Sequence, residues 1–257
     1  MSKSSGSEQR INELFLFIKS RRAWNTRFQL AEYRRCLSAC DSAHQRIVAL
    51  MHMVVHTQSK PKLSALATFW QWMNSAPWGN RAPTLVELID FIERTEAHSH
   101  VAVGPWDRLF RALEAIDGWG PKTAALFVKC VINLHRSNLN ELHFISDVEA
   151  ARGIDSDRVY LPVDAVIRAI FSAVAEVSAT VSVHALNTFL RDLGYGPEDI
   201  LLWDDLWYWG FFTQNSSSKK RVFGWNPARF WGELSAPKAD IHILEEECTA
   251  FSELMHS

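Results

Sequence analysis

Apolar residues recur at helical spacing along most of this chain. Ile11, Leu14 and Ile18 lie three and four residues apart, which places their side chains on one face of an α-helix. The alternation of apolar and polar residues that marks a half-buried strand is nearly absent. The chain is therefore predicted to be all-α. Helices are expected over residues 28–57, 63–74, 85–96, 106–116, 122–135, 164–176, 183–193, 198–213 and 227–234, and after residue 239.

Two segments depart from this periodicity. Residues 1–7 are rich in Ser and Gly and are predicted to form a flexible tail. Residues 137–158 are polar, contain an acidic run and lack a clear period, so we interpret them as an insertion. Thr84 followed by Glu87 is a capping box that starts one of the helices. No internal repeat is found, and we expect residues 8–257 to form a single fold of two helical lobes around a cleft.

A short Gly-rich turn connects two of the predicted helices, 106–116 and 122–135. Residues 116–123 read Ile-Asp-Gly-Trp-Gly-Pro-Lys-Thr. Gly118 and Gly120 permit a tight turn that larger residues would block, and Pro121 suits the first turn of the next helix, where its missing N–H costs nothing. The N–H groups and positive end of that helix favour a phosphate group. The segment 106–135 therefore resembles a helix-hairpin-helix, a motif that holds DNA by its backbone.

A second motif lies downstream, where residues 161–168 read Leu-Pro-Val-Asp-Ala-Val-Ile-Arg. Pro162 favours an extended conformation for Leu161. Asp164 then stands where the next helix begins, a position at which a carboxylate accepts backbone N–H bonds. Asp164 is thus predicted to be a helix N-cap.

The two motifs together resemble the helix-hairpin-helix DNA glycosylase superfamily. This resemblance implies that Lys122 is the nucleophile of a bifunctional enzyme, that Asp164 is the essential carboxylate, and that both face the cleft. The positive end of a helix disfavours an ammonium, which suits an amine that must attack. A Schiff base formed by Lys122 would permit an AP-lyase step. The resemblance further implies that the turn contacts the DNA backbone through Gly118, Trp119, Gly120 and Thr123.

Within this superfamily the chain is most similar to the archaeal 8-oxoguanine DNA glycosylases. The interval from Lys122 to Asp164 is long, as in that group, and the helix after the lysine has the same form, from Lys122-Thr123 to Val128-Lys129. Leu126 departs from the group, which carries a base-stacking aromatic at this position. The expected base is therefore either an oxidised purine such as 8-oxoguanine, excised in repair, or a hypermodified phage base such as glucosylated hydroxymethylcytosine, excised in antiviral defence.

An enzyme that acts on a flipped base needs a flat apolar pocket and a wedge for the vacated stack. The chain has eleven Trp, most of which are expected in the core. Trp119 stands out because it lies in the turn beside Lys122. Gln45 and Gln58 are of a type that can read a base edge. The candidates for pocket or wedge are Trp24, Trp72, Phe127 and Trp225.

The net charge of −2 is unevenly distributed, since residues 1–62 balance at +7 and the remainder at −9. DNA would then be attracted by local basic patches. The first patch comprises Lys19, Arg21, Arg22, Arg27, Arg34 and Arg35 around Trp24. The second comprises Lys219, Lys220 and Arg221 and leads to Trp225 and Arg229.

Metal and cofactor motifs are not recognised. His52 and His56 lie one helical turn apart, but Met53 stands where the zinc-protease motif needs Glu. Of four Cys, only Cys248 lies near the C-terminus, so no iron–sulfur cluster is expected. No secretory signal or paired Cys framework is seen, and no apolar run has the length to cross a bilayer. We expect a cytoplasmic monomer that binds double-stranded DNA, with no membrane partner, metal or cofactor.

Two alternatives remain open. The chain could be a non-catalytic helix-hairpin-helix DNA-binding protein, in which Lys122 only contacts a phosphate and Asp164 only caps a helix. It could also be a nucleoside hydrolase on the same fold, acting on free nucleosides rather than on DNA.

Overall fold

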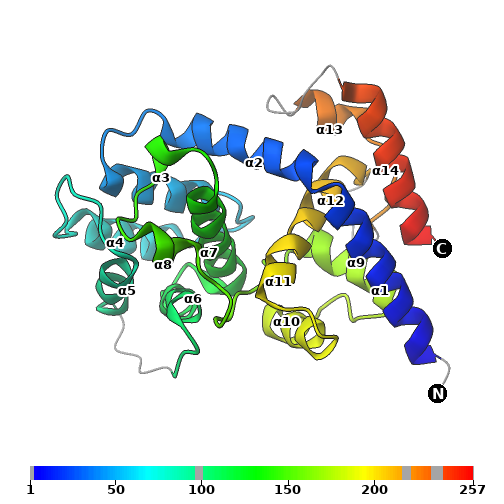
Figure 1. The fold of residues 1–257 in the computed structure, drawn as a ribbon, viewed down its shortest axis with the longest axis horizontal. Helices are drawn as coiled ribbons and strands as arrows, with labels where there is room; N and C mark the ends of the chain where they lie inside the picture. Colours follow the sequence, from blue (N-terminus) through cyan, green and yellow to red (C-terminus); the bar gives the residue numbers. More distant parts are fainter. Residues whose placement is uncertain (1–2, 96–100, 216–220, 233–239, 257) are drawn as a thin grey trace. The chain divides into compact units, whose positions relative to one another are not determined.

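The computed structural model describes residues 3–95, 101–215, 221–232 and 240–256. All regular structure in these ranges is helical, and one isolated antiparallel bridge pairs Gln214 with Phe223 (Figure 1). The predicted all-α class is confirmed. None of the helices in the described ranges is long and apolar enough to span a bilayer.

Backbone contacts divide the chain into two compact units. Unit 1 combines residues 1–29 with 163–257, and unit 2 is the continuous segment 30–162. Lys122 therefore belongs to unit 2 and Asp164 to unit 1, one residue beyond the boundary.

Unit 2 is organised around α7 (Gly120–Arg136), which packs against three other helices of the unit (Figure 1). These are α3 (Ala43–Val55), α6 (Pro105–Ala115) and α8 (Val148–Arg152), and α6 packs in turn against α5 (Leu85–Glu93). Most side chains of α7 are buried, even that of Lys129. The remaining elements are the second part of α2 (Arg22–Leu37), α4 (Leu63–Asn74) and the short 3-10 helix η1 (Asn140–Leu142).

Unit 1 is centred on α9 (Ala165–Ala175), which packs against α1 (Lys3–Ser20), α12 (Asp205–Thr213) and α14 (Ile241–His256). Gly210 lets α12 approach α9 closely, because a Cβ at this residue would lie 2.3 Å from Cγ1 of Val166. The buried rings of Trp203, Trp209 and Phe212 form much of the core. The other helices are the start of α2, α10 (Val183–Asp192), α11 (Pro197–Trp203) and α13 (Pro227–Gly232).

The observed helix boundaries correct several predictions. The stretch 28–57 is two helices, because the chain breaks after Leu37 and a capping box of Ser42 and Gln45 starts α3. The stretch 198–213 is likewise divided at Asp204. Residues 3–7 are the start of α1 rather than a flexible tail. The capping box of Thr84 and Glu87 is confirmed.

Residues 137–158 are built into unit 2 through hydrogen bonds that no periodicity reveals. The ring of His135 is buried, and its Nε2 accepts N–H bonds from Phe144 and Ile145 at 3.2 and 3.0 Å. The carboxylate of Asp157 accepts N–H bonds from Trp106 and Asp107 at 2.6 and 3.1 Å, and so caps α6 from 51 residues away. The polar residues of this segment therefore satisfy buried backbone groups. Its origin as an insertion stays a prediction.

We predict that His135 makes the protein sensitive to mild acid. Burial lowers the pKa of this imidazole to about 4, whereas the unfolded chain titrates near the ordinary value of 6.5. Between these values the unfolded state binds a proton that the folded state does not. Stability is therefore unaffected above pH 6.5 and falls by roughly 3 kcal/mol as the pH drops toward 4.

Urea unfolding at pH 7.0, 5.5 and 4.5 would measure this loss. His135→Gln should be less stable at pH 7 but should lose less stability with falling pH than the wild type. His242→Gln, which changes an exposed histidine of α14, should follow the wild type. An unchanged pH dependence in His135→Gln would contradict the assignment.

Candidate functional site

The turn between α6 and α7 has a backbone that only glycine adopts without strain. Gly118 and Gly120 have φ angles of +90° and +67°. A side chain at Gly118 would also approach the packed neighbour Leu66, since its Cβ would lie 3.3 Å from that residue's Cγ. The N–H of Trp119 closes the turn by donating to the carbonyl of Ile116 at 3.1 Å. Both glycines are thus explained by backbone geometry alone.

The side chain of Trp119 points into unit 2 and anchors the turn. It is only 2% exposed, and its ring packs edge-on against Phe69 and Phe127 at centroid distances of 5.4 and 5.9 Å. The Trp119 side chain is therefore part of the core, and the contact of the turn with the DNA backbone stays a prediction about its N–H groups. Phe127 is fully buried as well, so its assignment to a base pocket is corrected. Both side chains belong to the core, as is common for large aromatic residues on helices.

Gln58, just beyond α3, holds the turn from outside. Its Nε2 donates to the carbonyls of Gly118 and Trp119 at 2.9 and 3.4 Å, and to the hydroxyl of Thr123 at 3.0 Å. Thr123 is only 2% exposed, so its side chain is part of this structural contact, and its predicted contact with the DNA backbone stays a prediction. Gln58 and Gln45 were candidates for reading a base. Instead, Gln58 fixes the turn and the Gln45 side chain accepts the N–H bonds that start α3.

Lys122 lies in the first turn of α7 and is half-buried. Its Nζ donates a hydrogen bond to Oγ1 of Thr57, the residue before Gln58. Lys62, four residues after Gln58, forms an exposed ion pair with Asp117 of the turn at 2.6 Å. This contact lowers the pKa of the Asp117 carboxyl. Thr57, Gln58 and Lys62 were not singled out as partners of the turn by periodicity, because each contact spans more than fifty residues.

Asp164 caps α9 in unit 1, as predicted. Its Oδ1 accepts N–H bonds from Val166 and Ile167 at 2.8 and 2.9 Å. The extended backbone at Asp164, with φ −99° and ψ −170°, is that of an N-cap residue. Both bonds fall on one oxygen, and the carboxylate is half-buried.

The other aromatic candidates have mixed surroundings. Trp72 stacks on Phe91 at 4.9 Å and donates its N–H to the Phe91 carbonyl, which indicates a structural role. Trp24 is half-buried beneath the guanidinium of Arg27, at 4.8 Å from the ring centroid. Trp225 is half-buried near Phe230.

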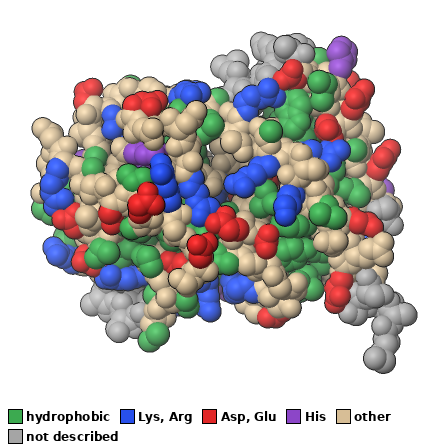
Figure 2. Space-filling model, viewed as in Figure 1, with side chains coloured by type: hydrophobic (Ala, Val, Ile, Leu, Met, Phe, Trp, Pro, Cys, Tyr) green, Lys and Arg blue, Asp and Glu red, His purple; other side chains and the backbone are tan. Residues whose placement is uncertain are grey.

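The first basic patch is partly neutralised. Arg27 pairs with Asp240 at 3.0 Å, Arg21 pairs with Glu247, and Arg35 pairs with Glu32. On the face shown in Figure 2, Lys and Arg side chains are interspersed with Asp and Glu. Lys219 and Lys220 of the second patch lie outside the described residues.

His52 and His56 are the two residues whose spacing would suit a metal ion, although no metal is expected. The ring of His52 stacks on Trp70 at 3.8 Å, and burial lowers its pKa. In the described ranges, no group of three or more His, Cys, Asp or Glu side chains is arranged to hold a metal ion.

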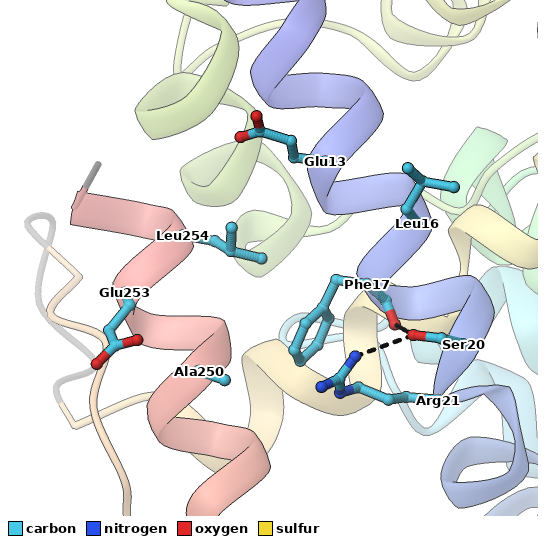
Figure 3. Close-up of a pocket in the computed structure, with 8 residues that line it drawn as sticks. All are labelled: Glu13, Leu16, Phe17, Ser20, Arg21, Ala250, Glu253 and Leu254. Atoms are coloured by element: carbon cyan, nitrogen blue, oxygen red, sulfur yellow. Dashed lines mark hydrogen bonds between the residues drawn. The ribbon is translucent and has the colours of Figure 1, made fainter.

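An open groove of about 570 Å³ lies between α1 and α14 in unit 1 (Figure 3). The guanidinium of Arg21 lies over the ring of Phe17, 4.2 Å from its centroid. The groove contains none of the predicted site residues. It is lined by Glu13, Leu16, Phe17, Ser20, Arg21, Ala250, Glu253 and Leu254.

Comparisons of the chain with models of protein families, with curated proteins and with solved structures give no match.

We predict that Gln58→Ala destabilises the protein by about 1–3 kcal/mol, because it removes the donor to two turn carbonyls and to the Thr123 hydroxyl. Urea unfolding followed by tryptophan fluorescence would measure the change. Gln71→Ala, at an exposed position of α4, is the matched control and should shift stability by less than about 0.5 kcal/mol. Equal unfolding midpoints for Gln58→Ala and wild type would show that the amide does not hold the turn.

Proposed function

We propose that this protein is a DNA glycosylase that flips a modified base out of the duplex and cleaves its N-glycosidic bond, with an AP-lyase step through Lys122. The observation that supports this most is the setting of Lys122. A primary amine lies in the first turn of α7, directly after a turn fixed by two left-handed glycines, the Trp119 ring and Gln58. A rigid turn at a helix N-terminus suits a DNA phosphate, and an amine beside that phosphate is within the reach of a deoxyribose.

Lys122 would act as the nucleophile. The lone pair of Nζ attacks C1′, the bond from C1′ to the base breaks, and the base departs with that electron pair. The ammonium formed on Nζ loses a proton, which neutralises the base. The nitrogen lone pair then expels O4′, which takes up a proton, and a Schiff base results. Loss of a C2′ proton from this Schiff base expels the 3′ phosphate, which is the lyase step.

Asp164 would stabilise the positive charge that develops on the sugar as the base leaves. The N–H groups of Val166 and Ile167 hold its Oδ1, so the carboxylate has a fixed orientation. Capping and catalysis are compatible, because a cap needs only one of the two oxygens.

The base remains one of the two classes named above, an oxidised purine or a hypermodified phage base. Leu126, half-buried in α7, stands where the 8-oxoguanine enzymes carry an aromatic. A panel of duplexes with single modified bases, together with phage DNA carrying glucosylated hydroxymethylcytosine, would identify the released base by mass spectrometry.

For the nucleophile, we expect borohydride to trap the wild-type protein covalently on its substrate duplex, because borohydride reduces the Schiff base to a stable amine. Lys122→Ala should give no trapped complex. Lys60→Ala, which removes an exposed amine two residues after Gln58, is the control and should be trapped like the wild type. Trapping of Lys122→Ala would rule out Lys122 as the nucleophile.

For the carboxylate, we expect Asp164→Asn to reduce the rate of base release by at least about 10²-fold, with DNA binding retained. Asn caps helices about as well as Asp, so stability should change little. Ser182→Ala removes the N-cap side chain of α10 in the same unit. This control should release base at the wild-type rate, which would show that a weakened cap alone does not stop catalysis. DNA binding without base release by the wild type would favour the non-catalytic DNA-binding protein, whereas base release from free nucleosides without DNA binding would favour the nucleoside hydrolase.

A further inference from the structure

We infer that Thr57 is a positioning residue for the Lys122 amine, an inference that rests on the proposed function. Thr57 lies two residues beyond the end of α3, and its Oγ1 accepts a hydrogen bond from Nζ of Lys122, 65 residues away. Its side chain thereby restricts the rotation of a long and otherwise adaptable lysine.

The direction of this hydrogen bond is fixed by a second one. The Thr57 hydroxyl donates its single proton to the carbonyl of Val54 at 2.7 Å. It can therefore only accept from Lys122. An unprotonated amine held in this way gives an N–H to Thr57, so this hydrogen bond does not use its lone pair. A hydroxyl that was free to rotate would donate its proton to that lone pair and block the nucleophile.

Thr57 is held in this position by its neighbours in the chain. Its N–H also donates to the Val54 carbonyl, at 3.1 Å. The next residue, Gln58, is bonded to the turn that precedes Lys122. One two-residue segment thus fixes both the backbone before the amine and the amine itself. The Thr57–Lys122 contact lies at the exposed surface of unit 2, so removal of the hydroxyl should affect orientation much more than folding.

The chain contains a matched control for this hydroxyl. Thr95 also lies just beyond the end of a helix, α5, and both its N–H and its hydroxyl donate to the carbonyl three residues earlier, at 3.1 and 2.8 Å. Thr95→Val therefore reproduces the local change of Thr57→Val at a residue that has no assigned role. Thr57→Ser keeps the hydroxyl and removes only a methyl group.

The test measures the rate of borohydride trapping on a duplex with a single abasic site, since the aldehyde of that site reacts directly with an amine. Thr57→Val should trap about tenfold more slowly than the wild type, at unchanged affinity for the duplex, because the amine is no longer oriented. Thr57→Ser should recover the rate to within about twofold, and Thr95→Val should match the wild type. The affinity and the recovery by Ser separate a positioning role from a loss of folding.

Trapping by Thr57→Val at the wild-type rate would overturn this inference alone, as would a Ser variant as slow as the Val variant. No trapping by the wild type, or equal trapping by Lys122→Ala, would overturn the nucleophilic role of Lys122 and this inference with it.

Discussion

The hydrogen bonds from the Gln58 amide to the turn between α6 and α7 are the constraint on which the candidate site depends. The left-handed glycines make the turn possible, but they do not by themselves select one conformation. Selection comes from both sides of the turn, since Trp119 fills the core beneath it and Gln58 binds its carbonyls from beyond α3. This arrangement fixes the backbone at Lys122, whose amine donates a hydrogen bond to Thr57.

Features set by neighbouring residues could be read from the sequence. The helical period, the capping box at Thr84 and the N-cap at Asp164 all depend on residues within one or two turns. The break after Leu37 was missed although it too has a local signal, because residues 38–46 contain no large apolar side chain and Ser42 with Gln45 forms a capping box. The short helices η1 and α8 in residues 137–158 were missed for a different reason. The backbone of this segment is held by His135 and by polar contacts, which leave no periodic trace.

Within the site, local patterns predicted the glycine turn and the Asp164 N-cap but not the direction in which the side chains face. Gly118, Gly120 and Lys122 lie in the turn as expected, whereas Trp119, Thr123 and Phe127 point into the core. All six residues belong to one motif. Which of their side chains are buried and which are exposed cannot be predicted without knowing what packs against α7. Gln58 acts across sixty residues, a contact that no local pattern encodes. The chemistry assigned to Lys122 and Asp164 stays a proposal.

The division of the chain has a consequence for biosynthesis. Unit 2 is one uninterrupted segment, so all of its helices have left the ribosome once Pro162 has emerged, and it can fold while translation continues. The first helix of unit 1, α1, is synthesised before unit 2, but the helices that it packs against are synthesised after unit 2. Its buried residues Ile11, Leu14 and Ile18 have their partners in α9, α11 and α14, which are synthesised more than 140 residues later. Until then the residues that α1 buries in the folded unit lack their packing partners, so unit 1 cannot complete its core before α14 has been made.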